Sequence, residues 1–260
     1  MEKMKIERIK NAFKAASAHL LISMLVAMLC AAIVFWLWYP PPYDQISSGR
    51  QLFVLVMAVD IVCGPVLTFI VFDRLKSRGE LLRDMGFVVL LQLTALAYGL
   101  FSVMQARPVW LAFEGDRFRV VSVPDIDIKR LSDAPASMQN LSLTGPTLLG
   151  VQLIDGDDPG YRRSIELALE GLHPAFRPGR WTSYEQQEIA VRKIAKPLND
   201  LYKKYPQQEF SIKELVHSLG VSDEKIGYLP LQANNGQEWT VLIDLDTARP
   251  KKYIFLNAWD

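Results

Sequence analysis

Three long apolar segments within the first 104 residues constrain this 260-residue chain more than any other feature. They cover residues 17–38, 51–72 and 86–104, so each is about 19 to 22 residues long. At a rise of roughly 1.5 Å per residue, an α-helix of this length crosses a hydrocarbon layer about 30 Å thick. No comparable segment follows, so the sequence predicts three transmembrane α-helices followed by a soluble domain.

The positions of the basic residues predict how these helices are oriented. Lys and Arg crowd the N-terminal tail, residues 1–16, and the second connection, residues 73–85, whereas the first connection offers only Arg50 at its edge. Because cytoplasmic loops carry the excess of Lys and Arg, the tail and the second connection are expected in the cytoplasm. An odd number of spans then exports the C-terminal part. We therefore expect a cytoplasmic tail (1–16), a three-helix transmembrane region (17–106) and an exported domain (107–260).

One acidic residue, Asp60, lies near the middle of the second apolar segment. A charged carboxylate there costs at least about 2.5 to 3.5 kcal/mol on insertion scales, so Asp60 must be neutral, paired or hydrated. It is followed by Gly64 and Pro65, which predict close helix approach and a kink. At a similar depth, the third segment offers Gln92, Thr94 and Tyr98.

The sequence leaves the role of Asp60 open. It either fastens the helices together through one of these polar side chains, or faces the membrane helix of a partner protein. A proton relay is the third reading, although Asp60 is the one carboxylate within the three apolar segments. The candidate residues for fastening or partner binding are Asp60, Gly64, Pro65, Gln92 and Tyr98.

Short β-prone runs and turn residues predict an α+β fold with antiparallel strands for the exported domain. Runs at 109–113 and 118–123 flank Glu114-Gly115-Asp116-Arg117, a typical hairpin sequence. A further strand is expected at 147–154. Three more β-prone runs close the chain at 226–231, 239–245 and 251–258, the first two joined through Asn234-Asn235-Gly236.

Helical patterns fill the middle of this domain. One helix is expected at 161–170, and another pattern covers 184–205, where Pro197 predicts either a kink or two shorter helices. Ser211 and Glu214 have the spacing of a capping box and predict a helix that starts there and ends at Gly220.

The residues do not point to catalysis, a metal, a cofactor or nucleic acid. His173 and His217 lack Cys or acidic neighbours at metal-ligand spacing, and no nucleophile elbow, phosphate-binding loop or dinucleotide motif occurs. Cys30 and Cys63 both lie in apolar segments, which leaves the exported domain without a disulfide. Trp181 and Tyr184 could line a groove for a peptide or sugar, or pack in the core.

Several short motifs, taken in their order and spacing, resemble the type IV pilin accessory protein family, the TfpX/TfpZ group. They are distributed over nearly the whole chain: Trp38-Tyr39-Pro40, Asp60-Ile61-Val62-Cys63-Gly64-Pro65, Leu96-Ala97-Tyr98-Gly99-Leu100, Ala106-Arg107-Pro108-Val109, Asp116-Arg117-Phe118, Thr144-Gly145-Pro146 and Tyr228-Leu229-Pro230-Leu231.

The resemblance implies a protein of the bacterial inner membrane, without implying an enzyme, so we expect a non-enzymatic protein. The basic residues place its N-terminus in the cytoplasm, and its C-terminal domain is then periplasmic. The resemblance also implies that the protein helps a cognate major pilin to accumulate and assemble. Its partners would be the membrane helix and the periplasmic head of that pilin, together with the lipid bilayer. The alternative is a membrane-anchored periplasmic sensor or ligand-binding module, which the short cytoplasmic segments disfavour. A small transporter or membrane enzyme is a third class.

Overall fold

The computed structural model describes residues 2–233 and 236–259, and the chain divides into two compact units. The helical unit contains the chain up to Pro41 together with Gly49–Ala106. The sheet unit contains Pro42–Ser48 and the chain from Arg107 onward. The short segment between the first two long helices therefore groups with the C-terminal part of the chain.

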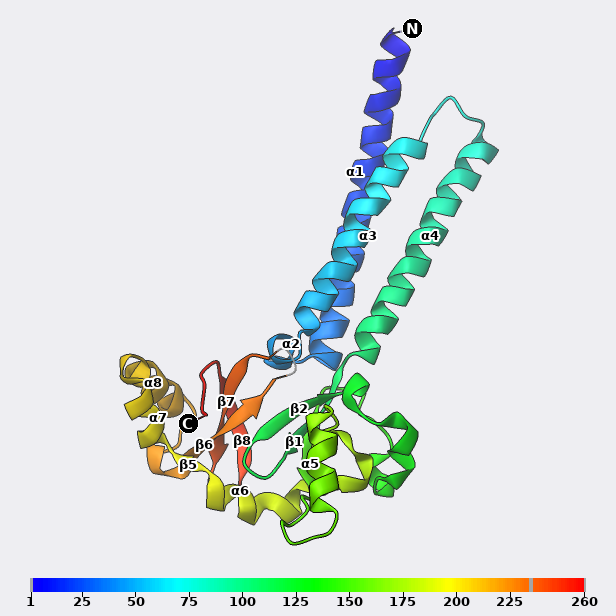
Figure 1. Ribbon diagram of the computed structural model, residues 1–260. Helices are drawn as coiled ribbons and strands as arrows, with labels where there is room; N and C mark the ends of the chain where they lie inside the picture. The colour runs from blue at the N-terminus through cyan, green and yellow to red at the C-terminus, as the bar shows by residue number, and fades with distance from the viewer. Residues whose placement is uncertain (1, 234–235, 260) are drawn as a thin grey trace. The chain divides into compact units, whose positions relative to one another are not determined.

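The helical unit consists of three long helices (Figure 1). α1 (Glu2–Ile33) continues through a π-helical turn (Val34–Trp38), and α3 (Gly49–Val71) and α4 (Arg78–Gln105) follow. Among the described residues, three stretches are long and apolar enough to cross a membrane: Ile6–Trp38, Gly49–Val71 and Arg78–Gln105. Three long apolar helices are thus confirmed, whereas their insertion into a bilayer stays a prediction.

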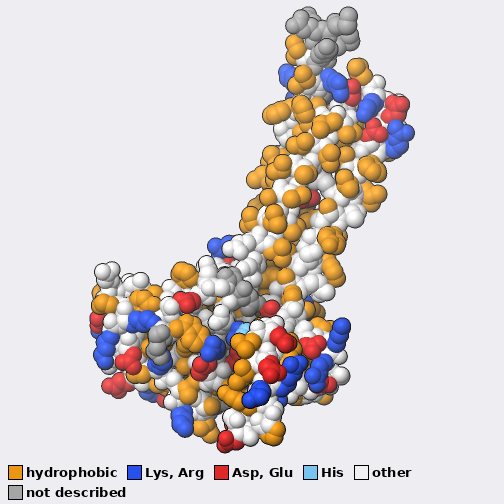
Figure 2. All heavy atoms as spheres, in the orientation of Figure 1, with side chains coloured by type: hydrophobic (Ala, Val, Ile, Leu, Met, Phe, Trp, Pro, Cys, Tyr) orange, Lys and Arg blue, Asp and Glu red, His pale blue; other side chains and the backbone are white. Residues whose placement is uncertain are grey.

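Side-chain hydrogen bonds fix the ends of these helices. A capping box starts α4, because the Glu80 amide donates to the Ser77 hydroxyl and the Ser77 amide donates to the Glu80 carboxylate. After the π-helical turn of α1, the buried Tyr39 hydroxyl donates to the Val103 carbonyl of α4 at 2.9 Å. Figure 2 shows apolar side chains over the visible face of the helices and charged ones near the connection between α3 and α4.

The sheet unit is built on a mixed sheet, which in the described part of the chain has eight strands. They are β1 (Pro108–Phe113), β2 (Phe118–Ser122), β3 (Thr147–Val151), β4 (Trp181–Thr182), β5 (Lys196–Pro197), β6 (Ile226–Gln232), β7 (Glu238–Asp244) and β8 (Arg249–Ile254). The order is β4-β3-β1-β2-β6-β7-β8, and β5 pairs with β6. The helices of this unit are α2 (Tyr43–Ile46), α5 (Tyr161–Leu169), α6 (Glu188–Ile194), α7 (Leu198–Lys204) and α8 (Glu209–Ser218).

The prediction of antiparallel strands is confirmed only in part, because the sheet is mixed. The predicted hairpin β1–β2 and the meander β6–β7–β8 are antiparallel, but β1 pairs with β3 and β2 pairs with β6 in parallel. Local turn residues specify strands joined by short loops, whereas the parallel pairs join segments separated by long connections. The two parallel strand pairs depend on how these long connections pack on the sheet. Turn residues give no information about that packing.

The helices predicted for the sheet unit are confirmed in part. The segment 184–205 forms the two shorter helices α6 and α7, and α5 lies where a helix was expected. Helix α8 ends before Gly220, whose φ is +71°, but it starts at Glu209, so the capping box predicted at Ser211 is wrong. A 3₁₀ turn, Pro206–Gln208, leads directly into α8 and places Ser211 inside it. Of the turn predicted at Asn234-Asn235-Gly236, the two asparagines lie outside the described residues.

Side chains pack on both faces of the sheet. One face carries the largest core cluster, where Leu111, Phe118, Leu229 and Val241 from four strands meet α6. On the opposite face, the connection after β2 covers β1 and β3, and α7 and α8 cover β6 and β7. This two-sided burial explains why β1 and β2 are buried at every position instead of alternating between buried and exposed.

The α2 segment supplies part of the largest core cluster. Ile46 is fully buried and Tyr43 is 9% exposed, and both belong to this cluster. The hydroxyl groups of Tyr43 and Tyr253 lie 2.7 Å apart in a hydrogen bond, and their rings meet edge to face. Burial, and next the neighbouring Tyr253 phenol, raise the pKa of Tyr43 well above its ordinary value, so the phenol stays neutral. The core is therefore completed by a segment that precedes its strands by some 60 positions.

Replacing Ile46 by Ala should destabilise the sheet unit by about 2 to 5 kcal/mol, because it leaves a cavity in a fully packed core. The matched control is Ile189→Ala, the same chemical change at a side chain that is 79% exposed on α6. The control should change stability by less than about 0.5 kcal/mol. Thermal unfolding of the detergent-solubilised protein, followed by near-ultraviolet circular dichroism, measures both. Equal melting temperatures for the two variants would contradict the role given to α2.

Candidate functional site

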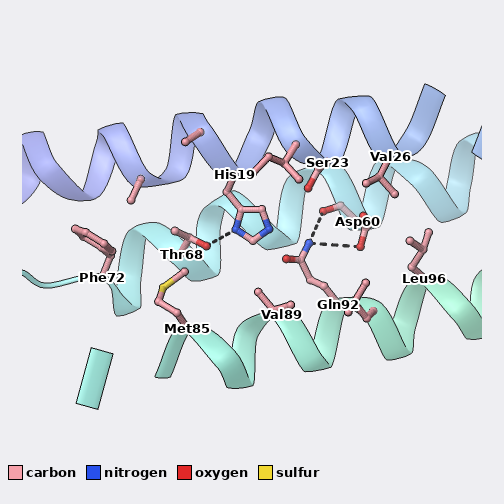
Figure 3. Close-up of a pocket in the computed structure, with 14 residues that line it drawn as sticks. His19, Ser23, Val26, Asp60, Thr68, Phe72, Met85, Val89, Gln92 and Leu96 are labelled. Carbon is pink, nitrogen blue, oxygen red and sulfur yellow. Dashed lines mark hydrogen bonds between the residues drawn. The ribbon is translucent and has the colours of Figure 1, made fainter. Parts of the chain in front are cut away.

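A groove between α1 and α4, with α3 as its floor, is the most distinctive feature of the helical unit (Figure 3). Helix α3 packs against both α1 and α4. The groove encloses about 330 Å³, and its lining residues share an apolar character interrupted by a few polar side chains: Ala15, Ala18, His19, Ile22, Ser23, Val26, Asp60, Thr68, Phe72, Met85, Val89, Gln92, Leu93 and Leu96.

Asp60 and Gln92 meet across α3 and α4 in this groove. The Gln92 amide nitrogen donates to the Asp60 main-chain carbonyl at 3.2 Å and to its carboxyl Oδ1 at 3.4 Å. Gly64, one turn further along α3, makes room for the Gln92 amide, because a Cβ there would overlap it. The Gln92 Oε1 atom is buried and has no hydrogen-bond partner among the described residues. The pair thus offers an unused acceptor in an apolar setting.

A second polar pair in the groove lies closer to the connection between α3 and α4. The His19 Nδ1 atom of α1 and the Thr68 hydroxyl of α3 are hydrogen-bonded at 2.5 Å, and Ser23, 5% exposed, lies one turn further along α1 (Figure 3). Polar side chains in an apolar groove can form hydrogen bonds with the polar groups of a ligand, which water does not reach there. The groove is therefore suited to bind an apolar ligand that carries one or two polar groups.

The predicted site residues of the helical unit are only partly brought together. Asp60, Gly64 and Gln92 meet as described, and Pro65 lies inside the continuous helix α3. Thr94 instead donates to the Leu90 carbonyl of its own helix. Tyr98 is 74% exposed and does not line the groove.

The sequence alone did not single out His19, Ser23 or Thr68 as site residues. The spacing of these residues along the helices could have identified them. Asp60, Gly64 and Thr68 follow one another at intervals of four, as do His19 and Ser23, so each set lies along one helix face.

Trp181 and Tyr184, predicted either to line a groove or to pack in the core, are core residues. They are 4% and 2% exposed and belong to clusters on opposite faces of the sheet. The Trp181 indole donates to the Ala175 carbonyl at 2.8 Å, and the Tyr184 hydroxyl donates to the Ala248 carbonyl. Within the described residues, no group of three or more His, Cys, Asp or Glu side chains could hold a metal ion.

Comparison with known proteins identifies relatives over most of the chain. A family described as fimbrial assembly protein FimB matches residues 7–48. The fimbrial assembly protein of serogroup I from Dichelobacter nodosus is 34% identical over 240 residues, which cover 92% of this chain and 93% of the relative. This chain belongs to the fimbrial assembly protein family. The family confirms the resemblance to type IV pilus accessory proteins found in the sequence.

Other members of the family agree with this assignment. The serogroup E1 protein of the same organism is 33% identical over 92% of this chain and 93% of its own length. The protein of serogroups C1 and C2 is 38% identical over 49% of this chain and 98% of its own length. No solved structure matches the chain significantly. The names of the family and of these relatives describe the assembly of fimbriae.

Replacing Gly99 by Ala should disturb the packing of α3 against α4, because its Cβ would overlap the Val56 side chain. We expect a loss of about 1 to 3 kcal/mol, the usual cost of overpacking. Gly86→Ala is the matched control on the same helix, since a Cβ there meets nothing within 4 Å. The control should be neutral or gain up to about 1 kcal/mol from helix propensity. Thermal loss of helical circular dichroism in detergent measures both. A Gly99 variant as stable as the control would refute the close contact.

Proposed function

We propose that this fimbrial assembly protein is a non-enzymatic accessory protein of the bacterial inner membrane that holds a cognate type IV major pilin before assembly. A pilin that awaits assembly has an apolar N-terminal helix in the membrane and a globular head outside it. The groove carries the proposal, because it offers an apolar surface with a few polar groups to a single apolar helix. The sheet unit is then free to contact the pilin head.

Features of the helical unit support the proposed orientation. The basic tail and the basic connection between α3 and α4 lie at the same end, since Arg8 of α1 forms an ion pair with Asp73 at 3.1 Å. Basic residues at that end favour the cytoplasmic side. The segment Pro42–Ser48 belongs to the sheet unit, so the first connection and the C-terminal domain share one side of the membrane in this proposal. That side is the periplasm.

Asp60 and Gln92 would recognise a polar group on the pilin helix. Gln92 already donates to Asp60, which leaves the second carboxyl oxygen of Asp60 and the Gln92 Oε1 atom as acceptors. In a medium without water, a donor on the incoming helix gains a partner only where such acceptors are placed. The groove would therefore fix the depth at which the pilin helix is held.

Photocrosslinking from two adjacent positions of α4 tests the groove as the pilin site. Val89 lines the groove and is 45% exposed, whereas Leu90 is 63% exposed and points elsewhere. A photoreactive residue at position 89 should give pilin as the main adduct in native membranes. The same residue at position 90 should give mostly lipid or no protein adduct. Equal pilin adducts from both positions would contradict a defined groove.

Replacing Asp60 by Asn should reduce pilin recovery in co-purification while the level of the accessory protein itself is unchanged. Asn keeps an acceptor for Gln92 but loses the second carboxyl acceptor. Loss of one such hydrogen bond costs about 0.5 to 1.5 kcal/mol, or roughly two- to tenfold in binding. Asp73→Asn, which alters a carboxylate outside the groove, serves as the control. If the Asp60 variant itself disappears from the membrane, the residue fastens the helices and does not bind pilin.

A further inference from the structure

A second hollow, in the sheet unit, is lined by four arginines and has no part in the groove. It encloses about 780 Å³ between α5, the 3₁₀ segment Ile128–Asp133 and the 3₁₀ turn Pro178–Arg180. We call it the arginine cleft, and its charged lining residues are Asp127, Arg130, Arg163, Arg177 and Arg180. Its volume is typical of pockets that bind small molecules or short segments of a partner.

The positive charge of the arginine cleft is only partly neutralised. Arg130 pairs with Asp133 at 2.8 Å and Arg163 pairs with Glu166 at 3.2 Å, and both of these arginine side chains are mostly exposed. Arg177 and Arg180 form no ion pair among the described residues, and Asp127 is the acidic side chain of the lining. Two guanidinium groups are therefore left facing the same hollow without a carboxylate of their own.

Arg177 is the most constrained of these side chains. One of its terminal nitrogens donates to the Ser164 hydroxyl at 2.7 Å, which holds the guanidinium against α5. Its Nε atom is buried and has no hydrogen-bond partner among the described residues. Burial, and next the charge of Arg180, lower the pKa of Arg177 below its ordinary value. A buried donor without an acceptor is costly, and an incoming oxyanion would relieve both this cost and the repulsion between the arginines.

We propose that the arginine cleft is a binding site for an oxyanion, a carboxylate or phosphate group carried by a ligand of the sheet unit. The planar guanidinium fork matches both groups with paired hydrogen bonds. Arg177 provides the fixed donor, and Arg180 the second charge. The site is independent of the groove, so a failure of the pilin proposal leaves this one intact.

Calorimetric titration of the full chain in neutral detergent tests the site with two probes. Pyrophosphate represents a small phosphate ligand, and a hexaglutamate peptide represents an acidic segment of a protein. Binding of either probe, weakened by salt, supports the proposal and tells which source of oxyanion the cleft prefers. Absence of binding by both probes at low salt overturns it.

Substitutions then locate the binding. The double change Arg177→Gln with Arg180→Gln should weaken binding by roughly tenfold or more. Arg162→Gln removes the same charge from the exposed side of α5, outside the cleft, and should change binding by no more than about twofold. If the double variant unfolds, probe binding is measured with Arg180→Gln alone. This change breaks no ion pair, because the Arg180 side chain forms none in the described structure. Equal losses from Arg162→Gln and Arg180→Gln would overturn the site.

Discussion

Burial of the α2 segment in the sheet unit is the interaction on which the organisation of this chain depends. Tyr43 and Ile46 fill the largest core cluster beside strands that begin only at Pro108. The chain enters the sheet unit at Pro42, returns to the helical unit at Gly49 and leaves it again after Ala106. The core of the sheet unit is therefore incomplete without the segment that connects the first two long helices in the chain.

Within the helical unit, the central position of α3 creates the groove. Gly64 and Gly99 permit close contact between α3 and α4, and Tyr39 ties the end of α1 to α4 near the opposite end of the groove from His19. The polar side chains gather where α1 and α4 do not close over α3. In the proposed function, this opening receives the apolar helix of the pilin, where packing and a few hydrogen bonds replace the hydrophobic effect inside a bilayer. Membership of the fimbrial assembly protein family connects this opening with the assembly of fimbriae.

The two candidate sites differ in the physics that would drive binding. The groove offers apolar contact and isolated acceptors, and it suits a helix that water does not solvate. The arginine cleft offers charge and planar donors in a water-accessible hollow, and its binding would weaken with salt. Their separation means that substitutions in one should leave the other unaffected.

The sequence by itself determined the elements whose cause is local. The length of the apolar segments predicted three long helices, and the Glu114–Arg117 turn predicted the β1–β2 hairpin. Pro197 predicted an interruption between residues 184 and 205, and the structure decided that it separates two helices, α6 and α7. The sequence also singled out Asp60 and Gln92, because a polar residue in an apolar helix is conspicuous. Only the tertiary structure decided the parallel pairings, the placement of α2 in the core and the meeting of Arg177 with Arg180 around one hollow. These depend on contacts between segments far apart in the chain, for which neither periodicity nor turn residues carry a signal.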